Sequence, residues 1–107
     1  MARLVWTASA LDDLEGIAEY IDLSNPSAAK KLVRTVFDKV SRLKKHPESG
    51  RVPAELAGLN YREVVVPPCR IFYRVDGDKV LILHVMREER DLLKFLLANG
   101  QKSNSPN

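Results

Sequence analysis

In the first 45 residues, apolar side chains first recur at every second position and then at every third or fourth position. Residues 3–6 alternate polar and apolar side chains, which predicts a short strand. Thr7 and Ser9 offer hydroxyl oxygens for a helix N-cap, so a helix is expected to begin near residues 8–10. Its apolar stripe has the spacing of an amphipathic helix and consists of Leu11, Leu14, Ile17, Ala18 and Ile21.

A second helix is expected directly after the first. Asn25 can cap it, and Pro26 suits its first helical position. It is expected to run to about Lys45, because the pair His46-Pro47 disfavours the helical conformation. Its apolar stripe consists of Ala29, Leu32, Val33, Val36, Phe37, Val40 and Leu43, and its opposite face carries Lys30, Lys31, Arg34, Lys39, Arg42, Lys44 and Lys45. The two helices therefore form a helical hairpin.

The second half of the chain predicts three strands, over residues 61–66, 70–75 and 79–86. Pro67-Pro68 separates the first of these strands from the second, because proline cannot donate a ladder hydrogen bond. Asp76-Gly77-Asp78 is a strong turn signal between the second and third strands. The three strands are therefore expected to form an antiparallel meander.

The two-residue period of the second and third strands separates two faces. The face predicted to be core carries Ile71, Tyr73, Val75, Val80, Ile82, His84 and Met86. The other face has an apolar centre flanked by cations and carries Arg70, Phe72, Arg74, Lys79, Leu81, Leu83, Val85 and Arg87. An apolar centre is unusual on a solvated face, so this face is predicted to be a groove filled by a ligand or partner.

Residues 88 to about 98 are predicted to form a short helix through Leu92, Leu93, Leu96 and Leu97. Residues 99–107 lack apolar anchors and are predicted to be a disordered tail after a single domain of residues 1–98. The fold class is thus α+β: an N-terminal strand, a helical hairpin, a three-stranded antiparallel meander that completes one sheet, and a short C-terminal helix. The core is expected to include Trp6, Leu14, Ile17, Leu32, Val36, Phe37, Tyr73 and Ile82.

Composition and charge narrow the class of protein. A single cysteine among 107 residues excludes an intrachain disulfide framework, and no apolar run is long enough to span a membrane, so a cytoplasmic protein without membrane contact is expected. Residues 1–25 hold one arginine and five acidic residues, a charge of −4. Because the net charge of the chain is +3, the remaining residues carry +7. A basic surface favours nucleic acid, a phosphate-rich assembly or an acidic protein as partner, and its alternative role is solubility.

Common catalytic signatures are absent from the sequence. It has no Gly-rich phosphate loop, no G-x-S-x-G and no paired histidines at metal spacing, so neither a cofactor nor a metal is expected. His84 is interpreted as a structural histidine of the core face, and Cys69 as a small buried hydrophobe.

The remaining candidates for a functional site are five arginines: Arg62, Arg70, Arg74, Arg87 and Arg90. Guanidinium groups bind phosphates and can stabilise the charge that develops during RNA cleavage. Such cleavage also needs a proton acceptor and a donor, for which Tyr61, Glu63, Glu88 and Glu89 are the nearby candidates. The alternative is that these arginines are solvent-exposed or ion-paired with Glu88, Glu89 and Asp91.

The chain resembles the RelE/ParE superfamily, the toxins of bacterial type II toxin–antitoxin modules. The matching pieces are Leu4-Val5-Trp6 with Ala10-x-Asp12-Asp13-Leu14-x-x-Ile17-x-x-Tyr20-Ile21, Asn25-Pro26-x-Ala28-Ala29, Leu43-x-x-x-Pro47-x-x-Gly50-Arg51, Tyr61-Arg62-Glu63, Arg70-Ile71-x-Tyr73-Arg74-Val75 and Arg87-x-x-Arg90-Asp91. They follow one another in the family's order over residues 4–91. The resemblance implies a small toxin whose sheet groove is covered by a cognate antitoxin. That groove would be lined by Arg70, Phe72, Arg74, Leu81, Leu83, Val85, Arg87 and Arg90.

The superfamily implies two different activities. RelE-like members cut mRNA on the ribosome, which would make Arg62, Arg70 and Arg87 catalytic residues. This chain departs from that pattern, with Val64 where a second strand cation is common and Lys94-Phe95 where a catalytic tyrosine is expected. ParE-like members poison DNA gyrase by binding it, and they share the Asn-Pro-linked helical hairpin and the Arg-x-x-Arg-Asp close.

The ParE-like interpretation is favoured, although Arg87 stands where those members usually have a histidine. A third interpretation is a relic that binds an antitoxin and has lost its toxicity.

Overall fold

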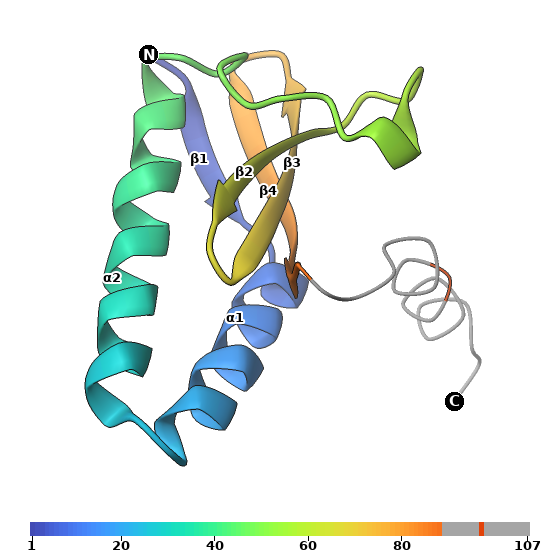
Figure 1. The fold of residues 1–107 in the computed structure, drawn as a ribbon. Helices are drawn as coiled ribbons and strands as arrows, with labels where there is room; N and C mark the ends of the chain where they lie inside the picture. The colour runs from blue at the N-terminus through green and yellow to red at the C-terminus, as the bar shows by residue number, and fades with distance from the viewer. Residues whose placement is uncertain (89–96, 98–107) are drawn as a thin grey trace, which may run out of the picture.

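The computed structural model describes residues 1–88 and Leu97 (Figure 1). Its elements follow in the order β1 (Arg3–Trp6), α1 (Ala8–Asp22), α2 (Pro26–Ser41), the 3₁₀ turns η1 (Arg42–Lys44) and η2 (Ala54–Leu56), β2 (Arg62–Val66), β3 (Cys69–Asp76) and β4 (Lys79–Arg87). The expected C-terminal helix near residues 88–98, the tail at 99–107 and Arg90 lie outside the described residues, apart from the ends of that helix at Glu88 and Leu97.

The strands form one four-stranded sheet in the order β1-β4-β3-β2 (Figure 1). The pairs β2–β3 and β3–β4 are antiparallel, which confirms the predicted meander. β1 pairs with β4 in parallel, with Leu4 opposite Val80 and Trp6 opposite Ile82. The α+β fold is therefore confirmed with one addition, because the N-terminal strand makes the sheet a mixed one.

Local capping explains where the helices begin. The Thr7 hydroxyl accepts a hydrogen bond from the Ala10 N–H at 3.2 Å and donates one to the Ile82 carbonyl at 2.8 Å. The Asn25 side-chain oxygen accepts from the Ala28 N–H at 3.1 Å, directly before Pro26. Both caps were predicted, and Thr7 also joins the start of α1 to β4, which no local pattern indicates.

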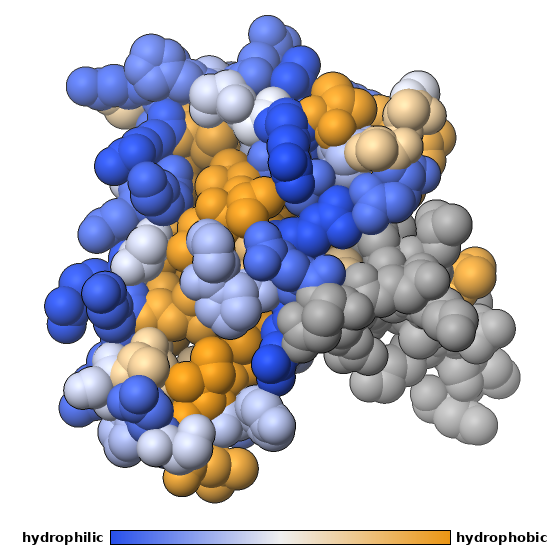
Figure 2. All heavy atoms as spheres, viewed as in Figure 1, coloured by the Kyte–Doolittle hydropathy of each residue, from blue (hydrophilic) through white to orange (hydrophobic). Residues whose placement is uncertain are grey.

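The core lies between the helical hairpin and one face of the sheet, and apolar atoms gather between α2 and the strands in Figure 2. Of the predicted core residues, Leu14, Leu32, Val36, Tyr73 and Ile82 are buried, and Trp6 and Ile17 are partly buried against them. The prediction for Phe37 was wrong, because its side chain is 40% exposed. It lies at the rim of the core, where its ring packs against Trp6 at a centroid distance of 4.8 Å.

A β-bulge in β4 changes the predicted faces of the sheet. Tyr73 lies opposite Ile82, whereas Phe72 lies opposite His84, so Leu83 has no partner on β3. Because one residue is inserted, the alternation beyond it is displaced by one position. Val85 therefore joins the helix-side core and Met86 leaves it, the reverse of the predicted assignment.

No helix among residues 1–88 is long and apolar enough to cross a membrane.

Candidate functional site on the open face of the sheet

The face of the sheet away from the helices, hereafter the open face, is partly covered by the loop between α2 and β2. Leu56 of η2 packs with Phe72 and Met86 into a second apolar cluster, and Tyr61 packs against it. Phe72 is consequently only 1% exposed. Of the predicted groove residues that the structure describes, Phe72 and Val85 are buried, and those that stay partly exposed are Arg70, Arg74, Leu81, Leu83 and Arg87. The open surface is therefore narrower than the sequence indicated.

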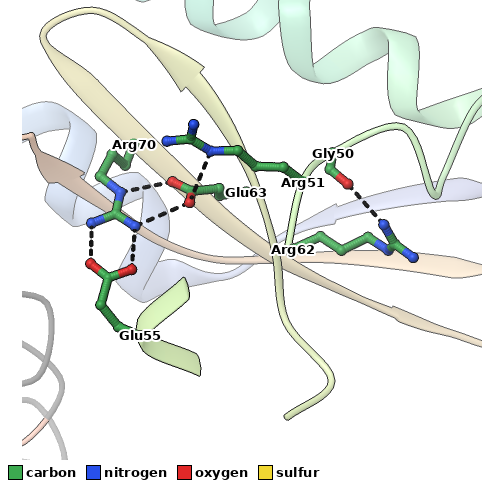
Figure 3. A network of polar contacts seen from close by, with 6 residues as sticks. All are labelled: Gly50, Arg51, Glu55, Arg62, Glu63 and Arg70. Carbon is green, nitrogen blue, oxygen red and sulfur yellow. Dashed lines mark hydrogen bonds and ion pairs between the residues drawn. The ribbon is translucent and has the colours of Figure 1, made fainter. Parts of the chain in front are cut away.

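Arg70 lies at the centre of a network of charged side chains on this face (Figure 3). Its Nε and Nη2 donate to the two carboxylate oxygens of Glu63 at 2.7 and 3.0 Å. Its Nη1 and Nη2 donate to Glu55 at 2.8 and 3.0 Å. Arg51 adds a third cation by donating from Nε to Glu63 at 3.2 Å. Two carboxylates thus hold one guanidinium on both of its sides.

Burial gives this network its electrostatic character. Glu63 is 2% exposed, and such a carboxylate is stable in its charged form only when it is paired and hydrogen-bonded. Hydrogen bonds from Arg70 to Glu55 lower the pKa of that carboxyl to about 2. The same two carboxylates, Glu55 first and Glu63 second, raise the pKa of Arg70. The guanidinium also stacks over the ring of Phe72 at 5.0 Å, so it bridges the ion pairs and the second apolar cluster.

Arg62 has a different position and different partners. It lies opposite Tyr73 in the register, on the helix side, and its Nη1 donates to the carbonyl oxygens of Gly50 at 2.8 Å and Glu48 at 3.1 Å. These bonds fix the loop that follows α2, with Gly50 also shown in Figure 3. Its guanidinium therefore holds the backbone of this loop in place.

Arg87 is separated from Arg70 by the bulge. It lies opposite Cys69, which belongs to the helix-side core, and its guanidinium lies over the ring of Tyr20 on α1 at 5.1 Å. The prediction that Arg87 shares a face with Arg70 was therefore wrong, as was that for Val85. The expected trio Arg62, Arg70 and Arg87 is divided between the two faces of the sheet.

The sequence did not predict Arg51 and Glu55 as members of the network, because they belong to an irregular loop whose path no periodicity reveals. Glu63 was considered as a proton carrier, and its pairing with Arg70 was missed. That pairing had a readable signal, because an antiparallel register counted from Pro67-Pro68 places Glu63 diagonally across from Arg70 on one face.

Comparisons with known proteins give a consistent family. Residues 4–92 match the model of the ParE toxin of the type II toxin–antitoxin system parDE. The chain is 39% identical over 89 residues to Toxin RelE2 of Caulobacter vibrioides, covering 81% of this chain and 92% of that protein. It is 38% identical over 86 residues to the protein Y4kP of Sinorhizobium fredii, covering 78% and 85%.

Two solved structures share the fold. The chromosomal ParDE system from P. aeruginosa has a TM-score of 0.71 and 29% identity, covering 83% of this chain and 98% of that one. The toxin–antitoxin complex RelBE2 from Mycobacterium tuberculosis has a TM-score of 0.54 and 21% identity, covering 81% and 98%. The chain therefore belongs to the ParE toxin family and is a toxin of a type II toxin–antitoxin system.

Proposed function

We propose that this toxin is a ParE-like poison of DNA gyrase that a cognate antitoxin neutralises. The observation that carries the proposal is the pairing and placement of the three arginines that a nuclease would use. Arg70 is held by Glu55 and Glu63, while Arg62 and Arg87 lie on the other side of the sheet. Transition-state stabilisation in phosphoryl chemistry requires preorganised cations aimed at one point, and these three are not.

The sequence adds a second argument against nuclease chemistry. An arginine is a poor general base, because its pKa is too high for it to lose a proton near neutral pH. Val64 and Lys94-Phe95 occupy the positions at which the RelE-like pattern has a cation and a catalytic tyrosine. The family model and the ParDE structure agree with the ParE-like branch, whereas the name of the Caulobacter relative belongs to the other branch.

Partial exposure of apolar groups on the open face supports the antitoxin as a partner. Leu81 and Leu83 are half-buried beside Arg74, which leaves apolar surface for a protein segment to cover. The P. aeruginosa relative was solved as a ParDE system. We therefore assign the antitoxin to the exposed remainder of the predicted groove, with Arg70 and Phe72 at its inner wall.

The decisive experiment compares the two targets side by side. Purified toxin is incubated with gyrase, ATP and supercoiled plasmid, and in parallel with ribosomes translating a defined mRNA. We expect linear plasmid DNA after protein denaturation, intact mRNA, and no DNA breakage when the antitoxin is added first. Cleaved mRNA with unaffected gyrase would establish the RelE-like alternative, and inactivity in both assays with retained antitoxin binding would identify a relic.

A further inference from the structure

The outer side of α2 and the turn after it concentrates exposed positive charge. Residues 26–45 hold seven lysines and arginines against one acid, Asp38. All seven of these cations are exposed, and we call them the basic face: Lys30, Lys31, Arg34, Lys39, Arg42, Lys44 and Lys45. At about 100° per residue, Lys31, Arg34 and Arg42 fall within an arc of roughly 80°, opposite the buried stripe of the helix. Figure 2 shows hydrophilic side chains along this side of the molecule.

The basic face is not neutralised within the part of the chain that the structure describes. None of its seven cations forms an ion pair there, although Asp38 lies four residues from both Arg34 and Arg42. Like charges also meet at helical neighbour spacings, in Lys30–Arg34, Lys31–Arg34 and Lys39–Arg42, which costs stability. This contrasts with Arg70, whose charge is matched by two carboxylates.

Negative charge is concentrated on the neighbouring helix. α1 carries five acidic residues and no lysine or arginine. A polyanion would therefore attract the α2 side and repel the α1 side, so the molecule would approach it in one orientation.

We propose that the basic face binds the phosphate backbone of duplex DNA without reading its sequence. α2 is a helix of 16 residues, about 24 Å long, so cations distributed along it and the turn after it can meet successive phosphates. α2 carries a single aromatic residue, Phe37, whose ring contacts Trp6, so this helix lacks the succession of aromatic rings on which the bases of a single strand stack. The choice of DNA rests on the proposed function, because the substrate of gyrase is duplex DNA.

The test measures the fluorescence anisotropy of a labelled DNA duplex of about 30 base pairs with purified full-length toxin, in increasing KCl and without gyrase. The double variant Lys31→Gln/Arg34→Gln is compared with the control Arg74→Gln/Lys79→Gln, which removes the same charge from the sheet. We expect wild-type affinity to fall steeply with salt. The first variant should lose more than about tenfold in affinity near 100 mM KCl and lower the salt slope by about 1.8, with the control within about twofold of wild type.

Equal losses in both variants, or no binding by the wild type at low salt, would overturn the proposal. Tighter binding to an RNA duplex of the same sequence would overturn the assignment to DNA. All four positions are on the surface, and unfolding midpoints of both variants check that the fold is kept. Because gyrase is absent from this assay, a failed DNA surface and a failed gyrase target are separate results.

Discussion

At the scale of single residues, the hydroxyl of Tyr73 joins the core to the loop that carries the charged network. It accepts a hydrogen bond from the Gly50 N–H and donates one to the Pro47 carbonyl, both at 2.8 Å. Gly50 is required for this contact, because a Cβ there would lie 2.5 Å from the Tyr73 oxygen. Burial raises the pKa of Tyr73, so the hydroxyl keeps its proton for the bond to Pro47.

Removing that hydroxyl should therefore be costly. In Tyr73→Phe the Gly50 N–H and the Pro47 carbonyl lose their partner in a buried place, and we expect the free energy of unfolding to fall by about 1–3 kcal/mol. Urea denaturation followed by circular dichroism measures the loss. Tyr20→Phe is the matched control, because Tyr20 is 62% exposed. Equal stability of the two variants would show that Tyr73 contributes through its ring alone.

The carboxyl of Glu55 predicts how stability responds to acid. Its folded pKa of about 2 lies below its ordinary value of 4.5, so its ion pair with Arg70 stabilises the folded state at neutral pH. That contribution decreases as the pH falls from about 4.5 to about 2. Glu55→Gln should thus be less stable than wild type at pH 7, and the difference should close near pH 2.

Unfolding midpoints recorded across that pH range test the prediction for Glu55. Glu15→Gln, at an exposed glutamate of α1, provides the control. A difference between wild type and Glu55→Gln that stays constant with pH would contradict the role of this ion pair.

At the scale of elements, the bulge in β4 shows where local patterns stop predicting structure. β1 ends opposite Ile82, and side chains at the start of α1 take over the freed edge of β4. The Thr7 hydroxyl donates to the Leu83 carbonyl at 3.3 Å, and Asp13 accepts from the Val85 N–H at 3.1 Å. The caps of Thr7 and Asn25 were readable because they are local. The bulge depends on contacts across more than 70 residues, so strict alternation assigned Val85 and Arg87 to the wrong face.

Because of the bulge, we expect aspartate substitutions at Val85 and Leu83 to have different effects. Val85→Asp places a charge at a residue that is 1% exposed in the main core, so the variant should be largely unfolded. Leu83→Asp changes a half-buried position and should fold, while binding the antitoxin at least tenfold more weakly because an apolar contact becomes a charge. Circular dichroism and a titration with purified antitoxin measure the two effects. A folded Leu83→Asp protein with wild-type affinity would place the antitoxin elsewhere.

At the scale of the whole molecule, the family could be recognised from ordered motifs because they mark caps, turns and strand ends that the fold requires. The antiparallel meander and the helical hairpin followed from these signals, whereas the parallel pairing of β1 with β4 did not. The charged network did not, since it depends on how residues 51–55 return over β3. A cluster of arginines in the sequence therefore indicated phosphate chemistry, whereas the fold pairs Arg70 with carboxylates and separates it from Arg62 and Arg87.

The extent of the folding unit gives the last prediction. Residues 99–107 contain no aliphatic or aromatic residue, so we expect their deletion to change the free energy of unfolding by less than about 0.5 kcal/mol. Deleting residues 89–107 also removes Leu92, Leu93 and Leu96, whose spacing predicts a helix with one apolar face. Leu97 is 66% exposed and is not counted among them. Even one fully buried leucine contributes about 1.5–3 kcal/mol, so the longer deletion should lower the free energy of unfolding by at least about 1.5 kcal/mol. Urea unfolding of the two shortened chains beside the full chain measures both effects, and equal stability of all three would place the end of the folding unit at β4.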